Sequence, residues 1–225
     1  MYSIKKIGRI TGVFLLIQMI LGILINVSLL GPLIFVSDFI TKISENTNQV
    51  LVSVLLIIIT KTIGVGVAIM LFPTFKKLNR GMSFWYLSFS VILFVISVID
   101  NTIILSLVSF SEQYQELSVS DANNLETLGK ILQGTRGWVH MMDLLVASVP
   151  LSIFYYLMFK SRFVPRILSV LCFFAAILIF INVLSTIFGT GSMYLYMPMA
   201  ISQMTFIAWL IIRGFNSTYK LQETV

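Results

Sequence analysis

Six apolar stretches, each about as long as a helix that crosses a membrane, constrain this chain more than any other feature. A transmembrane α-helix needs roughly 20 mostly apolar residues to cross the hydrocarbon core. Of the 225 residues, 58% are hydrophobic and only 11% are charged, whereas soluble domains carry about 25% charged residues. The predicted spans are 10–30, 50–72, 82–108, 136–159, 166–188 and 195–215. We therefore expect an all-α, polytopic membrane protein that forms one domain over residues 1–225.

Basic residues cluster in every second connection between these spans. Cytoplasmic connections of membrane proteins carry an excess of lysine and arginine, so the pattern predicts that both termini lie in the cytoplasm. The basic residues on that side are Lys5, Lys6, Arg9, Lys76, Lys77, Arg80, Lys160, Arg162, Arg166, Arg213 and Lys220. The other connections hold Lys42 and Lys130 among the acidic residues Asp38, Glu45, Glu112, Glu116, Asp121 and Glu126. The first apolar run has no A-x-A-like cleavage site after it, so we interpret it as an uncleaved first span.

The two longer outer connections also contain helix signals. Phe35, Phe39, Ile40 and Ile43 recur at helical spacing in the first of them. They predict a short amphipathic helix on the outer membrane interface, with an ordinary polar loop as the alternative. In the second connection, the Ser120-Asp121 pair (120–121) precedes ANNLETLGKIL and is typical of a helix start.

The fourth span begins with ionisable residues, which apolar helices rarely carry. Arg136, His140 and Asp143 stand at i, i+4 and i+7, so an α-helix places them on one face. Ionisable groups within a membrane are costly, and they usually face the bundle interior or a wet cavity, beside a partner. Lys61 in the second span and Asp100 in the third are candidate partners.

Lys61 is too far from either end of its span to reach water easily. Gly64 and Ala68 continue its helical face, and small residues allow a second helix to approach closely. We therefore expect Lys61 to face a neighbouring helix, with Asp100 or Asp143 as its counter-charge. Two interpretations stay open: a buried ion pair that fixes helix packing, and a site for a ligand, an ion or a proton relay.

Most polar residues of the spans fall in the outer half of the predicted bundle. This distribution predicts a polar pocket that opens to the outside and is closed below by apolar side chains. The candidate binding residues are Lys61, Asp100, Asn101, Arg136, His140, Asp143, Asn182 and Gln203.

Catalytic and metal chemistry find little support in the sequence. The chain has one histidine and one cysteine, so a cysteine-rich zinc site and an intramolecular disulfide are both excluded. His140, Asp143 and Asp100 carry groups that are suitable ligands for a divalent metal. Membrane metallohydrolases, however, need more histidines than this chain has. Ser97 is the candidate nucleophile if His140 approaches it, but no G-x-S-x-G or P-loop motif is present. We expect no cofactor and no metal.

These observations favour three functions in descending order. The first is the binding or transport of a small polar or amphiphilic solute through the outer pocket. The second is a structural or regulatory membrane subunit whose charges only lock the helices together. The third is an intramembrane hydrolase. Besides the lipid bilayer we expect a small-molecule partner and no nucleic acid, because the basic residues form no patch with interleaved aromatics.

Three segments resemble a family of small bacterial membrane proteins. They are KKIGRITGVFLL at the start, KSRFVPRILSVL at the turn into the fifth span, and QMTFIAWLIIRGFN at the end. Together they are similar to the family described as domain of unknown function DUF4386. The resemblance implies a six-helix protein of the bacterial cytoplasmic membrane and brings no established activity. Members often place an acidic residue six positions before the tryptophan, Trp209 here, where this chain has Gln203.

Overall fold

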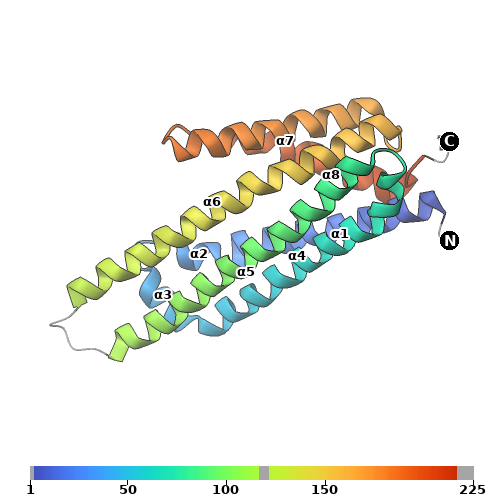
Figure 1. Ribbon diagram of the computed structural model, residues 1–225. Coiled ribbons are helices and arrows are strands. Elements are labelled where there is room, and N and C mark those ends of the chain that lie inside the picture. The colour runs from blue at the N-terminus through green and yellow to red at the C-terminus, as the bar shows by residue number, and fades with distance from the viewer. Residues whose placement is uncertain (1–2, 117–121, 217–225) are drawn as a thin grey trace. The chain divides into compact units, whose positions relative to one another are not determined.

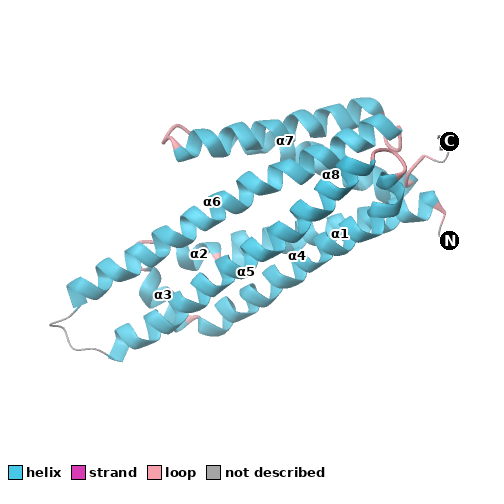
Figure 2. Cartoon of the chain, in the orientation of Figure 1, coloured by secondary structure: helices cyan, strands magenta, loops and turns pink. Residues whose placement is uncertain are grey.

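The computed structural model describes residues 3–116 and 122–216 (Figure 1). Within these residues the chain is helical with short connections, and no strand occurs (Figure 2). Six helices among the described residues are long and apolar enough to cross a membrane: Ile4–Ile34, Thr47–Lys76, Arg80–Gln115, Leu125–Ser161, Arg166–Ile187 and Met193–Arg213. The prediction of an all-α protein with six membrane-spanning helices is confirmed.

The first span is built from several helical segments. It joins α1 (Ile4–Ile23) to a π-helical segment, η1 (Leu24–Leu29), and to the short α2 (Gly31–Ile34), and α3 (Phe39–Glu45) follows it. The remaining helices are α4 (Thr47–Lys76), α5 (Arg80–Glu116), α6 (Ala122–Ser161), α7 (Arg166–Ile187), the 3-10 turn η2 (Met193–Tyr196) and α8 (Met197–Arg213). Pro198 lies in the first turn of α8, where its missing N–H is tolerated.

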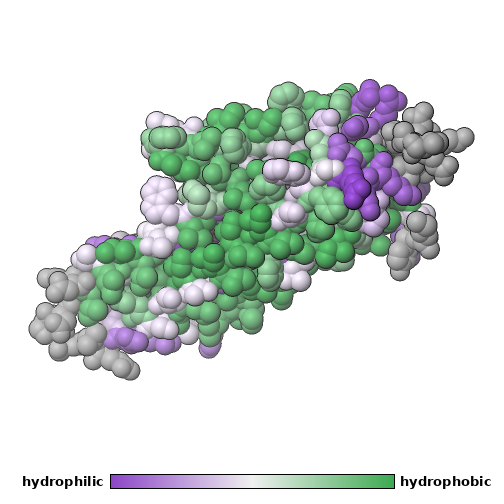
Figure 3. Space-filling model, viewed as in Figure 1, coloured by the Kyte–Doolittle hydropathy of each residue, from purple (hydrophilic) through white to green (hydrophobic). Residues whose placement is uncertain are grey.

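Large apolar side chains remain exposed along the spans. Ile20, Leu55, Val95, Leu171 and Ile201 are exposed by half or more of their surface. Figure 3 shows apolar residues over most of the visible face of the helices. Such a surface is unfavourable in water and favourable against lipid chains, so it agrees with a membrane location.

The chain packs as two compact units, which we describe separately. The polar unit comprises Gln18–Thr62 and Phe94–Asp143. The aromatic unit comprises the described residues of Met1–Ile17, Ile63–Leu93 and Leu144–Val225. Each unit has its own cluster of buried apolar side chains.

In the polar unit, α5 and α6 continue well beyond their most apolar segments. They contain 37 and 40 residues, against the predicted spans 82–108 and 136–159. Phe110 of α5 and Leu132 of α6 pack against the buried cluster that includes Phe39, and this contact stabilises the extensions. The helix predicted within the second outer connection is therefore not separate from the fourth span, and its residues form the first turns of α6. The predicted helix start at 120–121 lies outside the described residues.

The short helix predicted in the first outer connection is confirmed as α3. Its residues Phe39, Ile40 and Ile43 are at most 7% exposed. The apolar face of α3 thus packs against protein, whereas its amphipathic sequence predicts a position on the membrane interface. Phe35, which precedes α3, is 64% exposed and does not join this buried face.

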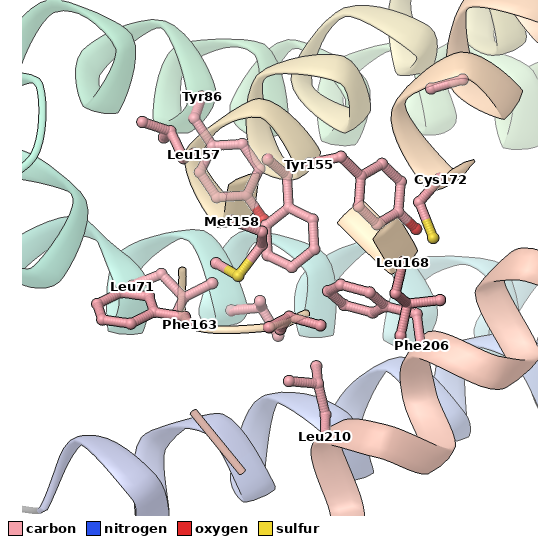
Figure 4. Close-up of a cluster of buried hydrophobic side chains, with 14 of the residues drawn as sticks. Leu71, Tyr86, Tyr155, Leu157, Met158, Phe163, Leu168, Cys172, Phe206 and Leu210 are labelled. Carbon is pink, nitrogen blue, oxygen red and sulfur yellow. The ribbon is translucent and has the colours of Figure 1, made fainter. Parts of the chain in front are cut away.

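The aromatic unit has a core of interlocking rings, shown in Figure 4. Tyr155 and Phe206 meet edge to face, with ring centroids 5.1 Å apart, which is a favoured geometry for aromatic pairs. Cys172 is completely buried beside Tyr155, and its thiol donates to the Ser202 carbonyl at 3.5 Å (Figure 4). The single cysteine is therefore a packing residue of this core.

Helix α1 packs closely against the end of α8 through two glycines four residues apart. A Cβ added at Gly12 would lie 2.8 Å from the Leu210 Cβ, and one at Gly8 would overlap the backbone nitrogen of Phe215. Arg9 strengthens the same contact, because its Nη2 donates to the Ile212 carbonyl at 3.1 Å. The last carbonyls of a helix have no partner within it, so Arg9 satisfies one of them.

We expect Gly8→Ala to lower the free energy of unfolding by about 1–3 kcal/mol, because backbone cannot yield as a flexible side chain can. Gly66→Ala is the matched control, since a Cβ there meets nothing within 4 Å. Gly66→Ala should leave the free energy of unfolding unchanged or raise it slightly. Unfolding of the purified protein in mixed micelles measures both. Equal stability of the two variants would contradict the close α1–α8 contact.

Candidate functional site

Two ion pairs join different helices within the polar unit. In the first, Lys61 of α4 donates to both carboxylate oxygens of Asp143 in α6, with Nζ–O distances of 2.6 and 2.7 Å. The two side chains are 25% and 14% exposed, so water reaches this pair in part. Of the two carboxylates expected from the sequence, Asp143 is the counter-charge of Lys61.

The second pair is more deeply buried and less well satisfied. Arg136 Nε lies 3.3 Å from Asp100 Oδ1, and the side chains are 3% and 10% exposed. The two groups are close enough to attract each other, but they are not aligned as a hydrogen bond. Arg136 Nη1 is also buried and has no hydrogen-bond partner. Since a guanidinium carries five N–H donors, Arg136 retains unused hydrogen-bonding capacity.

The four charged groups and His140 form one electrostatic cluster. Asp100 interacts with Asp143 and Lys61 as well as with Arg136. His140, which is half-buried, interacts with Arg136, Asp143 and Lys61. The two cations and two carboxylates balance, which lowers the cost of placing them among apolar helices. The prediction that Arg136, His140 and Asp143 share one face of a helix agrees with this arrangement.

A pocket of about 460 Å³ opens at the surface of the polar unit beside Arg136. One wall is apolar and comes from α2 and the residues after it; the other is a face of α6. The lining residues are Ile34, Phe35, Val36, Lys130, Gln133, Gly134, Arg136 and Gly137. Gln133 donates to the Ile34 carbonyl and so ties the two walls together. The guanidinium Cζ of Arg136 lies 5.4 Å from the centre of the Phe35 ring, within the range of a cation–π contact.

Two glycines leave space in the α6 wall of this pocket. A Cβ built at Gly134 or at Gly137 meets no atom within 4 Å. The pocket is therefore wide at these positions because α6 has no side chain there.

The remaining candidates from the sequence have local roles. Asn101 is 4% exposed, and its Nδ2 donates to the Val54 carbonyl at 3.3 Å in the polar unit. Asn182 of α7 and Gln203 of α8 belong to the aromatic unit. Asn182 Oδ1 accepts a hydrogen bond from the Ser192 backbone N–H at 2.9 Å, so it anchors the turn after α7. Gln203 is half-buried.

The geometry gives no support to nucleophilic chemistry at Ser97. Its hydroxyl donates to the Phe94 carbonyl of the same helix at 2.7 Å, as serines in helices commonly do. Among the hydrogen bonds of the described residues, none joins Ser97 to His140. Across the same residues, no three His, Cys, Asp or Glu side chains gather closely enough to hold a metal ion.

Sequence reasoning identified Arg136 but missed the other residues of its pocket. Lys130, Gln133 and Gly134 lie before the predicted span, in a segment expected to be a connection. Once α6 is known to begin at Ala122, Gln133 and Gly137 fall one turn apart beside Arg136. The sequence signal was the pair of glycines flanking Thr135-Arg136, because each leaves free space beside α6 where a side chain would stand.

Searches against curated proteins and against solved structures find no match for this chain. A family model described as Domain of unknown function (DUF4386) matches residues 10–214. The matched region contains the charged cluster and the pocket beside Arg136, and it includes each of the six apolar helices in whole or in large part. The chain therefore belongs to the DUF4386 family.

Proposed function

We propose that this protein binds a small amphiphilic anion in the pocket beside Arg136. The observation that supports this function best is Arg136, whose side chain is 3% exposed, which lines an open pocket and whose guanidinium has two buried nitrogens without a hydrogen-bond partner. A buried donor without a partner is unfavourable, so a ligand that supplies an acceptor gains affinity there.

The chemistry of the walls defines the class of ligand. Carboxylates and phosphates match the planar fork of an arginine and accept two hydrogen bonds from it. Ile34, Phe35 and Val36 offer an apolar surface opposite, which suits a hydrocarbon or aromatic portion of the same molecule. The volume of about 460 Å³ falls within the roughly 300–1,000 Å³ of small-molecule sites. A solute with an acidic head and a short apolar tail fits both walls.

Asp100 determines how strongly such an anion is held. It already neutralises Arg136 in part, at 3.3 Å, so the ligand shares the guanidinium with a carboxylate and does not meet an uncompensated charge. Moderate and reversible binding follows, as a receptor or a transporter requires. Uptake of a bound solute into proteoliposomes distinguishes these two activities.

We expect Gly137→Leu to weaken binding of decanoate at least about 10-fold, because the new side chain occupies the pocket at a position where an added Cβ meets no atom within 4 Å. The matched control is Gly22→Leu, where an added Cβ also meets nothing within 4 Å. Equilibrium dialysis of labelled decanoate against the protein in nanodiscs measures the affinity, with empty nanodiscs as background. Unchanged affinity of Gly137→Leu would exclude this pocket as the binding site.

We further expect Arg136→Lys to bind decanoate at least about 10-fold more weakly, because an ammonium keeps the charge but loses the planar fork. Arg136→Gln combined with Asp100→Asn removes both charges and leaves no unpaired carboxylate, so it should fold and lose binding. Decanol, which lacks the charge, should bind wild type and variants alike. Tight decanoate binding by the double variant would contradict a role for Arg136.

A second function, helix locking, is favoured for the other ion pair. Lys61 and Asp143 satisfy each other directly at 2.6 Å, and such a pair serves to fix which helix faces meet. In this interpretation the Lys61–Asp143 pair stabilises the scaffold, and the Arg136–Asp100 pair serves the ligand.

We expect Lys61→Met to lower the free energy of unfolding by about 1–3 kcal/mol, because it leaves Asp143 without its partner. The exchange Lys61→Asp with Asp143→Lys should recover most of this loss, since it restores the pair with its direction reversed. Unfolding in mixed micelles again provides the measurement. If the double variant is as unstable as Lys61→Met, the helix-locking role is contradicted.

We also propose that the protein lies in the bacterial plasma membrane with both termini in the cytoplasm. The basic residues at the ends of alternate spans support this orientation. It places the pocket beside Arg136 toward the outside.

This orientation is testable with single cysteines in a Cys172→Ser background. Glu45 lies between the first two spans and Lys77 between the second and third, and both are exposed. A membrane-impermeant maleimide should label Glu45→Cys in intact spheroplasts and Lys77→Cys only after permeabilisation. The reverse pattern would invert the topology.

A further inference from the structure

We propose that an anionic phospholipid binds in a second pocket, on the first turns of α1 in the aromatic unit. The pocket has a volume of about 540 Å³ and is lined by Lys5, Lys6, Arg9, Ile10, Val13 and Phe14, with Ser3 at its edge. This site is independent of the function proposed above, since none of its residues belongs to the polar unit.

The pocket has a basic end and an apolar end, in the order that a membrane lipid requires. Lys5, Lys6 and Arg9 come first along α1, and Ile10, Val13 and Phe14 follow toward the middle of the span. At 1.5 Å per residue, Lys5 and Val13 are separated by about 12 Å along the helix axis. A phosphate held by the basic side chains therefore lies at the level of the membrane surface, and its acyl chain runs along the apolar end.

The packing of α1 explains why these residues face outward together. Gly8 and Gly12 are buried in contact with the end of α8, and at about 100° per residue Lys6, Ile10 and Val13 lie on the other side of the helix. This contact fixes the rotation of α1 about its axis. Lys5, Lys6 and Arg9 are exposed, and Val13 is 44% exposed.

Arg9 gives the basic end a defined position. Its Nη2 is held by the Ile212 carbonyl at 3.1 Å, which restrains the side chain, and a guanidinium has five donors in total. An arginine that is already oriented loses less conformational freedom when it meets a phosphate than a freely moving one.

The apolar half of the pocket identifies the ligand as a lipid and not a free phosphate. A water-soluble phosphate gains nothing from Ile10, Val13 and Phe14, whereas an acyl chain covers them. The basic half selects an anionic headgroup over a zwitterionic one, since basic segments next to a membrane surface attract anionic lipids.

The test uses the purified full-length protein in detergent micelles and three probes: dioleoylphosphatidylglycerol, dioleoylphosphatidylcholine and glycerol 3-phosphate. Native mass spectrometry measures the lipid that is retained. We expect the wild type to bind phosphatidylglycerol at least about 10-fold more tightly than phosphatidylcholine. The variant Lys5→Gln with Lys6→Gln should lose this preference.

Lys76→Gln with Lys77→Gln is the matched control, because it removes the same charge from another exposed helix end that does not line the pocket. It should retain the preference, and all proteins should unfold at similar temperatures. The proposal is overturned by an equal loss in the two double variants, by no loss in either, or by the absence of a preference in the wild type. Glycerol 3-phosphate binding as tightly as phosphatidylglycerol would also overturn it, because the apolar half would then contribute nothing.

Discussion

The polar unit depends on the mutual compensation of charges in helices that are otherwise apolar. Lys61 joins α4 to α6, and Arg136 joins α6 to α5. An unpaired charge in such surroundings costs several kcal/mol, so arrangements that separate these partners are strongly disfavoured. Apolar faces of leucine, isoleucine and valine tolerate sliding and rotation much more readily. The two pairs thus specify the register of three helices that hydrophobic packing alone leaves loosely defined.

The two pairs differ in a way that separates structure from function. Lys61 makes two short hydrogen bonds to Asp143 and has no need of a further partner. Arg136 is more deeply buried than Lys61, and yet two of its nitrogens have no hydrogen-bond partner. A buried cation that lacks hydrogen-bond partners and lies beside an open pocket is typical of a binding site, where the ligand supplies the missing acceptors. This contrast is why we assign the ligand to Arg136.

The six spans were predictable because they depend on local properties, the length and hydropathy of each stretch. The shared face of Arg136, His140 and Asp143 was predictable for the same reason. The sequence also predicts a helix start just before Ala122, but not that this helix continues into the fourth span as α6. That continuity depends on contacts distant in sequence, such as that of Leu132 with the Phe39 cluster. Asn182 also looked like a site residue, since the sequence cannot show that its amide accepts from the Ser192 backbone. The choice of Asp143 over Asp100 for Lys61 likewise required the packed helices.

The glycines at 134 and 137 have a consequence for how members of this family can diverge. An added Cβ at either position meets no atom within 4 Å, so a small side chain can replace either hydrogen without a clash at its Cβ. The depth and shape of the cavity are then adjustable by single codon changes, while the arginine to which we assign the charged end of the ligand stays in place. One scaffold can in this way give rise to proteins that prefer short, long or branched solutes.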